Sequence, residues 1–250
     1  MNEQYKKIPA VALRGMVILP GMVAHFDVSR SVSIRAIEAA MMEEQTVFLV
    51  TQKNIENEEL EIENLYGMGI IASVKQVIKL QNSVVRVLIE GEVRARLMEI
   101  EQGNCLMAWV DPLLAEEEPL PAEIYAAMMR GIQETFTRYC LLNSKHGKEL
   151  ARQMQEIMDL EKLLDYIGNN LPLSYDKKQK ILEAESIQER YETIMIILLN
   201  EINIIQIKTE FQTKVKEKVD KNQKEYILRE QMKLIREELG EDNTVSEAEH

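Results

Sequence analysis

The stretch KNQKEYILREQMKLIREELG occupies residues 221–240, and the rest of the chain can be interpreted from it. It contains no proline and no internal glycine, and most of its residues are strong helix formers. Glu225 and Arg229 stand four residues apart, which is the spacing of stabilising charge pairs on an exposed helix. Gly240 follows where a left-handed C-cap would end the helix. The sequence therefore predicts a long, charged helix that ends near residue 240.

Two apolar stripes run along this helix and the residues before it. Phe211, Val215 and Val219 form one stripe, and the second stripe has a different phase. Because the register changes near Asn222, a sustained heptad repeat is absent and a long, simple coiled coil is not predicted. We expect the distal half to pack on something outside this chain. The candidate inter-domain or assembly residues are Tyr226, Leu228, Met232, Ile235 and Leu239.

The composition is that of a globular protein. A chain of 250 residues can bury a core in one or two domains. Apolar residues make up 46% of the chain and charged residues 29%, which argues against disorder. The net charge of −12 makes the chain a poor electrostatic partner for nucleic acid or an anionic membrane surface.

The cysteines and the N-terminus indicate a cytoplasmic location. Cys105 and Cys140 lie far apart in apolar contexts, without CxxC or Cys/His spacing, so we expect reduced core thiols. No apolar segment of a signal peptide follows Met1. The most apolar run, residues 194–207, is too short and too often interrupted by polar residues to cross a membrane.

The first 115 residues are predicted to form a β-rich domain. Apolar runs and turn residues indicate strands over residues 8–13, 17–19, 24–28, 46–51, 84–90, 92–101 and 106–110, and a further strand that follows residues 66–69 and runs through Leu80. Gln81-Asn82-Ser83 predicts a hairpin turn. One helix is expected from Ser31, as its N-cap, to about Glu44, with an apolar stripe of Ile34, Ile37, Ala40 and Met41.

The second hairpin strand suggests an apolar surface. Alternation places Val85, Val87 and Ile89 on one face, and Arg86, Leu88 and Glu90 on the wetter face. Leu88 is thus an apolar residue on a polar face, and the loop before residue 24 carries two more apolar side chains. The candidate surface comprises Met22, Val23, His25, Leu80 and Leu88. The alternatives are that each apolar residue packs on its own domain and that His25 is purely structural.

After residue 115 the pattern becomes helical. Residues 116–121, Glu-Glu-Glu-Pro-Leu-Pro, disfavour helix and central strand and predict a linker. A helical bundle is expected over 122–200, a long helix over 201–240 and a flexible tail over 241–250. Ser186 and Glu189 form a capping box that begins a helix. The expected core stripes are Met128, Ile132, Phe136 and Tyr139; Leu150, Met154, Ile157 and Met158; and Leu160, Leu163, Leu164 and Ile167.

Several separated blocks resemble the N-terminal region of bacterial Lon proteases. They are residues 8–14, 17–22, 75–80, 85–91, 170–174 and, most strongly, 222–240. Ala12 stands where the family usually has proline, and Ser29 where it usually has glycine. The resemblance implies an α+β fold, in which a PUA-like β subdomain precedes a helical bundle and a long protruding helix. It also implies a hexameric parent that is an ATP-dependent serine endopeptidase with a Ser-Lys dyad and uses ATP and Mg.

No catalytic, cofactor or metal motif is recognised in the chain itself. Gly147-Lys148 is followed by Glu149 and lacks the earlier glycine of a phosphate-binding loop. Ser174 and Lys177 match Ser-x-x-Lys, but a helix N-cap explains Ser174 better. Three histidines do not assemble a zinc site or a Ser/His/Asp triad. We therefore expect a non-catalytic piece.

Three functions remain open at this stage. The first is recognition of exposed hydrophobic segments of unfolded or damaged proteins for an AAA+ ring. The second is a spacer and assembly role through the helical half. The third, nucleic-acid binding by a PUA-like fold, is opposed by the acidic balance of the chain.

Overall fold

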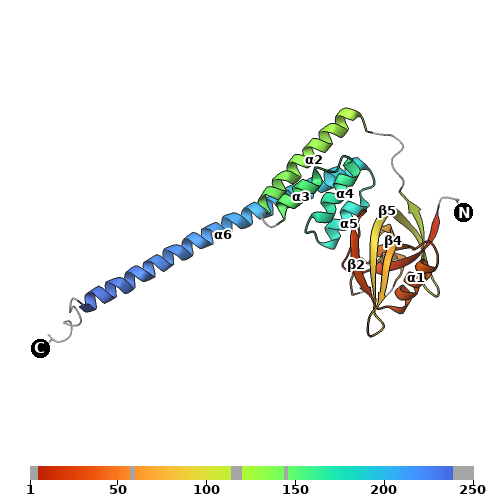
Figure 1. The fold of residues 1–250 in the computed structure, drawn as a ribbon, viewed down its shortest axis with the longest axis horizontal. Helices are drawn as coiled ribbons and strands as arrows, with labels where there is room; N and C mark the ends of the chain where they lie inside the picture. The colour runs from red at the N-terminus through yellow and green to blue at the C-terminus, as the bar shows by residue number, and fades with distance from the viewer. Residues whose placement is uncertain (1–4, 57–59, 114–119, 144–145, 239–250) are drawn as a thin grey trace. The chain divides into compact units, whose positions relative to one another are not determined.

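The computed structural model describes residues 5–56, 60–113, 120–143 and 146–238, and Figure 1 shows its fold. The chain divides into two compact units, Met1–Asn200 and Glu201–His250. In the described residues, the first unit holds a six-stranded sheet, helices α1–α5 and the start of α6, and the second holds the rest of α6. The fold is α+β, as predicted. Most of the predicted linker, the whole predicted tail and Leu239 lie outside the described residues.

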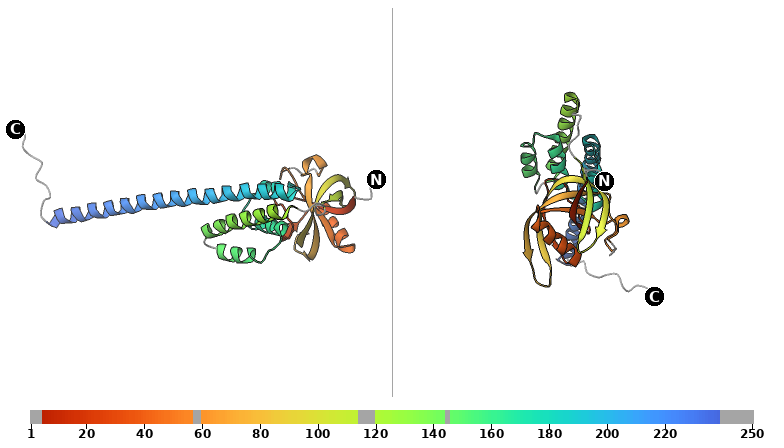
Figure 2. Two further views of the ribbon diagram at one scale, coloured as in Figure 1. Left: turned by 90° about the horizontal axis from the view of Figure 1, so that it is seen from above. Right: turned by 90° about the vertical axis from the view of Figure 1, so that its right-hand side faces the viewer.

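The sheet curls into a ring with one extra strand. Its order is β2-β5-β4-β3-β1-β6, and β5 also pairs with β6, so five strands close and β2 stays outside the ring. β1 and β3 are parallel, and the other pairs are antiparallel. The curl can be followed in Figure 2. The strands are β1 (Lys6–Leu13), β2 (Val23–Val28), β3 (Thr46–Thr51), β4 (Met68–Lys79), β5 (Val85–Gln102) and β6 (Leu106–Pro112).

β5 is one strand of 18 residues, where the sequence predicted two strands separated at Gly91. The Gly91 N–H donates to the carbonyl of Met22 at 2.9 Å, and its carbonyl accepts from the N–H of Gly21 at 2.8 Å. A Cβ at Gly91 would lie 2.4 Å from the carbonyl oxygen of Leu19. Glycine at this point permits a close approach of two backbones and does not end the strand.

The predicted strand at 17–19 is wrong. Val17, Ile18 and Leu19 are buried, but their backbone is irregular and belongs to no strand. The segment ends in a turn, in which the Met22 N–H donates to the Leu19 carbonyl at 3.1 Å. Its apolar run therefore reflects burial beside the sheet, which an isolated short run cannot distinguish from strand pairing.

Helix α1 (Ser31–Met42) covers one of two apolar clusters, with Ala36, Ile37 and Ala40 buried. The predicted start is off by one residue, because Arg30 takes the N-cap position and Ser31 is the first helical residue. Met41, predicted in the apolar stripe, is exposed. The second cluster fills the other face of the sheet and includes Ile8, Ala10, Phe48, Ala95, Leu106 and Val110.

The helical region follows the sheet. A short 3-10 turn, η1 (Ile62–Asn64), precedes β4, and the helices are α2 (Ala122–Leu142), α3 (Gly147–Met154), α4 (Leu160–Asn170), α5 (Tyr175–Glu183) and α6 (Ile187–Glu238). The capping box is confirmed, because the Glu189 N–H donates to Ser186 Oγ at 3.1 Å and the Ser186 N–H to Glu189 Oε2 at 3.4 Å. Met158, predicted in a core stripe, lies after α3 and is exposed.

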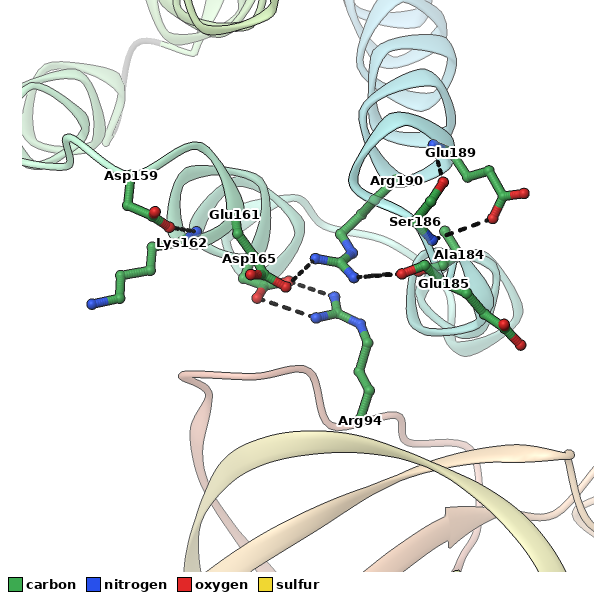
Figure 3. A network of polar contacts seen from close by, with 10 residues as sticks. All are labelled: Arg94, Asp159, Glu161, Lys162, Asp165, Ala184, Glu185, Ser186, Glu189 and Arg190. Carbon is green, nitrogen blue, oxygen red and sulfur yellow. Dashed lines mark hydrogen bonds and ion pairs between the residues drawn. The ribbon is translucent and has the colours of Figure 1, made fainter. Parts of the chain in front are cut away.

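A buried ion pair joins the sheet to the helices (Figure 3). Arg94 of β5 donates to both carboxylate oxygens of Asp165 in α4, at 2.5 and 3.3 Å. Arg190 of α6, also buried, donates to Glu161 Oε1 at 2.8 Å and to the carbonyl of Ala184 at 3.4 Å. Burial raises the pKa of the Asp165 carboxyl above its ordinary value, and the charge of Arg94 opposes that shift.

Two amides add further links between the sheet region and the helices. Gln179 of α5, which is buried, donates to the Met68 carbonyl at 3.0 Å. Asn169 of α4 donates to the Pro20 carbonyl at 3.0 Å. The sheet and the helices of the first unit are thus held together by directional polar contacts as well as by apolar packing.

Replacing Asp165 with Asn should lower the free energy of unfolding by about 3–5 kcal/mol, because the buried Arg94 guanidinium would lose its counter-charge. The control is Glu185→Gln, which breaks the exposed pair with Arg96 and should cost about 0–1 kcal/mol. Urea unfolding followed by circular dichroism measures both. Equal effects of the two variants would contradict the assigned role of the buried pair.

The two cysteines are free, and they differ in burial. Cys140 of α2 is 4% exposed, and burial raises the pKa of its thiol to about 11. Cys105, between β5 and β6, is half-buried. Because only the thiolate reacts with alkylating reagents, the two positions should differ in reactivity.

At pH 8 an alkylating reagent should modify Cys105 at least about tenfold faster than Cys140, since a thiol of pKa about 11 is only ~0.1% ionised there. Peptide mass spectrometry after timed labelling gives the two rates. In denaturant the rates should converge. Equal rates in the native protein would show that Cys140 is not protected by the fold.

Candidate functional site

β2 and the β4–β5 hairpin present one outer surface of the sheet. Residues directly opposite in antiparallel strands share a face, and the pairs here are Val23 with Glu90, His25 with Leu88, Asp27 with Arg86, and Ile78 with Arg86. Leu80 stands two residues after Ile78, and its N–H donates to the carbonyl of Val84 at 2.8 Å, so the pairing continues and Leu80 extends the same face. We call this surface the hairpin face; it comprises Val23, His25, Asp27, Ile78, Leu80, Arg86, Leu88 and Glu90.

Three apolar side chains of the hairpin face are exposed. Val23 is 61% exposed, Ile78 43% and Leu80 38%, whereas Leu88 is half-buried. The buried side chains of β5, Val85, Val87 and Ile89, point to the opposite side, as the sequence alternation predicted. The hairpin face is therefore an apolar surface that the described part of the chain leaves largely uncovered.

Two ion pairs flank Leu88 on this face. Arg86 donates to both carboxylate oxygens of Asp27, at 2.7 and 2.9 Å. Lys75 Nζ lies 2.8 Å from Glu90 Oε2 on the other side. The hydrogen bond from Arg86 holds the pKa of Asp27 below its ordinary value, so the pair remains ionised in mildly acidic solution. The charges pair across strands and leave the apolar groups between them.

Four of the five predicted surface residues lie on the hairpin face, and they are not all adjacent to one another. Val23, His25 and Leu88 are neighbours on adjacent strands. Met22 instead packs partly against the cluster under α1, which was the alternative interpretation for the apolar candidates. Leu80 lies at the hairpin end, opposite Val84, whereas Val23 lies opposite Glu90. Val84 and Glu90 are six residues apart, which is roughly 20 Å along an extended strand at 3.3 Å per residue.

Ile78 belongs to the hairpin face but was missed by sequence reasoning. Simple alternation from Val74, which pairs with the buried Ile89, would place Ile78 on the buried side, but the register between β4 and β5 shifts between Val74 and Gln76. Such a bulge moves all later side chains of the strand to the other face. No signal in the local sequence locates that shift.

The predicted assembly residues lie on the part of α6 that belongs to the second unit. Tyr226, Leu228, Met232 and Ile235 are each more than half exposed, and Leu239 is outside the described residues. At about 100° per residue, Leu228, Met232 and Ile235 share one side of the helix, and Tyr226 falls on the side of Phe211 and Val219. These residues thus fall on two sides of the helix, with Tyr226 on the side of the first stripe, while Ile227 and Leu234, which are also exposed, lie between the two.

A hollow of about 1180 Å³ also lies between the sheet region and helices α2 and α4 of the first unit. Its lining includes Tyr125, Met158, Arg94, Asp165 and Arg190. The three charged groups in this lining are engaged in the ion pairs described above (Figure 3). Within the described residues, no group of three or more His, Cys, Asp or Glu side chains could hold a metal ion.

The fold matches solved N-terminal domains of Lon proteases. The N-terminal domain of a Mycobacterium avium complex Lon protease superposes with a TM-score of 0.62 at 22% identity, covering 79% of this chain and 98% of that one. At this identity the likeness establishes the fold alone. No helix in the described ranges is both long enough and apolar enough to cross a membrane.

Sequence comparison gives the family. The family model described as the ATP-dependent protease La (LON) substrate-binding domain matches residues 7–200. A Lon protease of Lachnoclostridium phytofermentans is 43% identical over 248 residues, and one of Brevibacillus choshinensis is 39% identical over 236 residues. These alignments cover 99% and 94% of this chain, but only 31% and 30% of the relatives. The chain belongs to the Lon substrate-binding domain family and spans about a third of the length of these relatives.

Proposed function

We propose that this chain is the N-terminal substrate-recognition and tethering region of a bacterial, cytoplasmic ATP-dependent Lon protease that degrades misfolded and regulatory proteins. Membership of the substrate-binding domain family supports the first role. The relatives extend well beyond the matched region, and the ATP, the Mg and the Ser-Lys dyad of the enzyme would belong to that remainder. In this account the chain itself binds and positions, and the rest of the enzyme carries out the chemistry.

The hairpin face would bind exposed apolar segments of unfolded proteins. The observation that carries this proposal is the exposure of Val23, Ile78 and Leu80 on one sheet surface. Covering apolar groups that are in contact with water lowers the free energy, so an exposed apolar surface favours binding of a partner. The flanking pairs, Arg86–Asp27 and Lys75–Glu90, keep the surface soluble and would accommodate polar residues within a bound segment.

A surface of this size would bind each segment weakly. Only a few apolar side chains contribute, so the affinity of one face should be modest. In a hexamer, six such faces would act on one unfolded chain, and the second contact would form at a high effective concentration. Weak individual binding also allows release to an ATPase ring.

Replacing Leu88 with Glu should weaken binding of a reduced, carboxymethylated protein at least about tenfold, or about 1.4 kcal/mol, by placing a charge between two ion pairs. Leu88 is half-buried on the outer face, so the fold should persist. Fluorescence anisotropy of the labelled unfolded protein measures affinity.

The matched control is Met42→Glu, which adds the same charge to an 88% exposed methionine at the end of α1. This variant should bind like the unsubstituted chain. Unchanged affinity of the Leu88 variant, with an intact circular dichroism spectrum, would remove the hairpin face from the proposal.

Assembly of subunits through α6 is the second candidate function. It is favoured by the exposure of Leu228, Met232 and Ile235 along one side of a continuous helix. Such a stripe is suited to pair with another helix. The two functions are compatible, because the exposed stripe and the hairpin face belong to different units.

Replacing Met232 with Asp should raise the dissociation constant of any self-association at least about tenfold, because a charge would enter the apolar contact. Sedimentation equilibrium over a concentration series measures it. Phe211→Asp, on the other stripe, serves as the comparison. A native chain that stays monomeric at high concentration would contradict assembly through this helix.

A further inference from the structure

β2 is an edge strand with one side of its backbone unpaired in the sheet. Among the strands that the structure describes, it pairs with β5 only, and it terminates the strand order. The Gly91 N–H donates to the Met22 carbonyl, in register with the ladder of β2 and β5. Because bonded pairs alternate along an antiparallel ladder, Ala24, Phe26 and Val28 direct their backbone groups toward β5. The N–H and C=O groups of Val23, His25 and Asp27 therefore point away from the sheet.

In the described residues this edge carries few of the usual protections against another strand. Natural edge strands are commonly blocked by proline, lysine, bulges or a covering element. β2 reads Val-Ala-His-Phe-Asp-Val, with neither proline nor lysine, and its register with β5 shows no bulge. Val23, His25 and Asp27 are exposed in the described structure.

A hollow of about 210 Å³ adjoins the C-terminal half of β2 and is lined mainly by residues 11–14, 16, 26–30 and 33. Val11, Leu13, Met16, Phe26 and Val28 contribute apolar groups. Its lining comes from β1, from β2 and from the residues that follow each strand. β1 and β2 do not pair with each other, and Ala10–Leu13 of β1 pair with β3 instead. We call it the edge hollow. It offers space for an apolar side chain beside an open strand edge.

We propose that β2 takes up an extended segment of an unfolded polypeptide as an additional strand of the sheet. The backbone of the segment would bond to Val23, His25 and Asp27, and one of its apolar side chains would enter the edge hollow. The proposal rests on the proposed function, since it specifies how the same region binds unfolded protein. In strand addition, main-chain hydrogen bonds supply affinity and side-chain pockets supply selectivity.

The backbone is the one feature that all unfolded chains share. An edge that forms hydrogen bonds with backbone groups would bind segments of many sequences, and the adjoining hairpin face would favour segments with apolar side chains. A folded protein has already paired its backbone and cannot offer an extended segment. A second copy of this chain is the competing occupant, and the outcomes of the test distinguish it from an unfolded segment.

The test compares two synthetic peptides on the unsubstituted chain. One has alternating valine and threonine; the other has the same side chains with N-methyl groups on two adjacent central residues, one on each edge of an extended strand. The methyl groups block both edges without changing the side chains. Strand addition predicts at least about tenfold weaker binding of the methylated peptide by fluorescence anisotropy.

A backbone variant provides the second arm. His25→Pro removes an outward N–H and leaves the bonds of Ala24 and Phe26 to β5 in place, since proline is tolerated at outward positions of edge strands. This variant should bind the unmethylated peptide of alternating valine and threonine about tenfold more weakly than the native chain does. Ala122→Pro, at the exposed first residue of α2, is the control and should bind like the native chain.

The outcomes separate this inference from the function on which it rests. Equal binding of the two peptides, with binding still lost in Leu88→Glu, would overturn strand addition and leave the hairpin face as the binding surface. Failure of the native chain to bind either peptide or the carboxymethylated protein would overturn both. Self-association that the parent peptide does not inhibit and that His25→Pro abolishes would identify a second copy as the occupant and overturn the proposal.

Discussion

The arrangement of the first unit depends on the buried ion pair between Arg94 and Asp165. A guanidinium and a carboxylate in bidentate contact fix each other's orientation as well as their distance. Apolar packing alone tolerates small rotations of one layer over another, whereas two parallel hydrogen bonds do not. Arg190 and Glu161 extend the network from α4 to α6, so that a single cluster connects β5, α4 and the beginning of the longest helix of the described chain.

β5 carries this constraint to the proposed binding surface. Its C-terminal half bears Arg94 and pairs with β6, and its N-terminal half bears Leu88 and pairs with β2. Both halves remain in one strand because Gly91 lets the loop before β2 cross it closely. A rigid strand thus places the hairpin face and the open edge of β2 on a scaffold anchored to the helices. Binding surfaces of this kind lose less entropy on binding than those built from loops.

Much of the fold could be predicted from the sequence because it follows from local rules. The strand at 46–51, the capping box at Ser186 and the alternation along 85–89 each depend on a few neighbouring residues. The errors arose where distant contacts decide the outcome. Val17–Leu19 is buried without strand pairing, and Met22 packs partly against the core beneath α1. Gly91 forms backbone hydrogen bonds with Gly21 and Met22, about 70 residues earlier in the sequence. The face of Ile78 and the open edge of β2 depend on register and strand order, which no single segment encodes.

The most direct test of the account is an amide NMR titration of this chain with one protein in two forms, chemically unfolded and folded. The account predicts chemical-shift changes confined to β2 and the β4–β5 hairpin, and only with the unfolded form. Changes that are equally large with the folded form, or that occur only in the helices, would contradict the central claim that this side of the sheet selects unfolded chains.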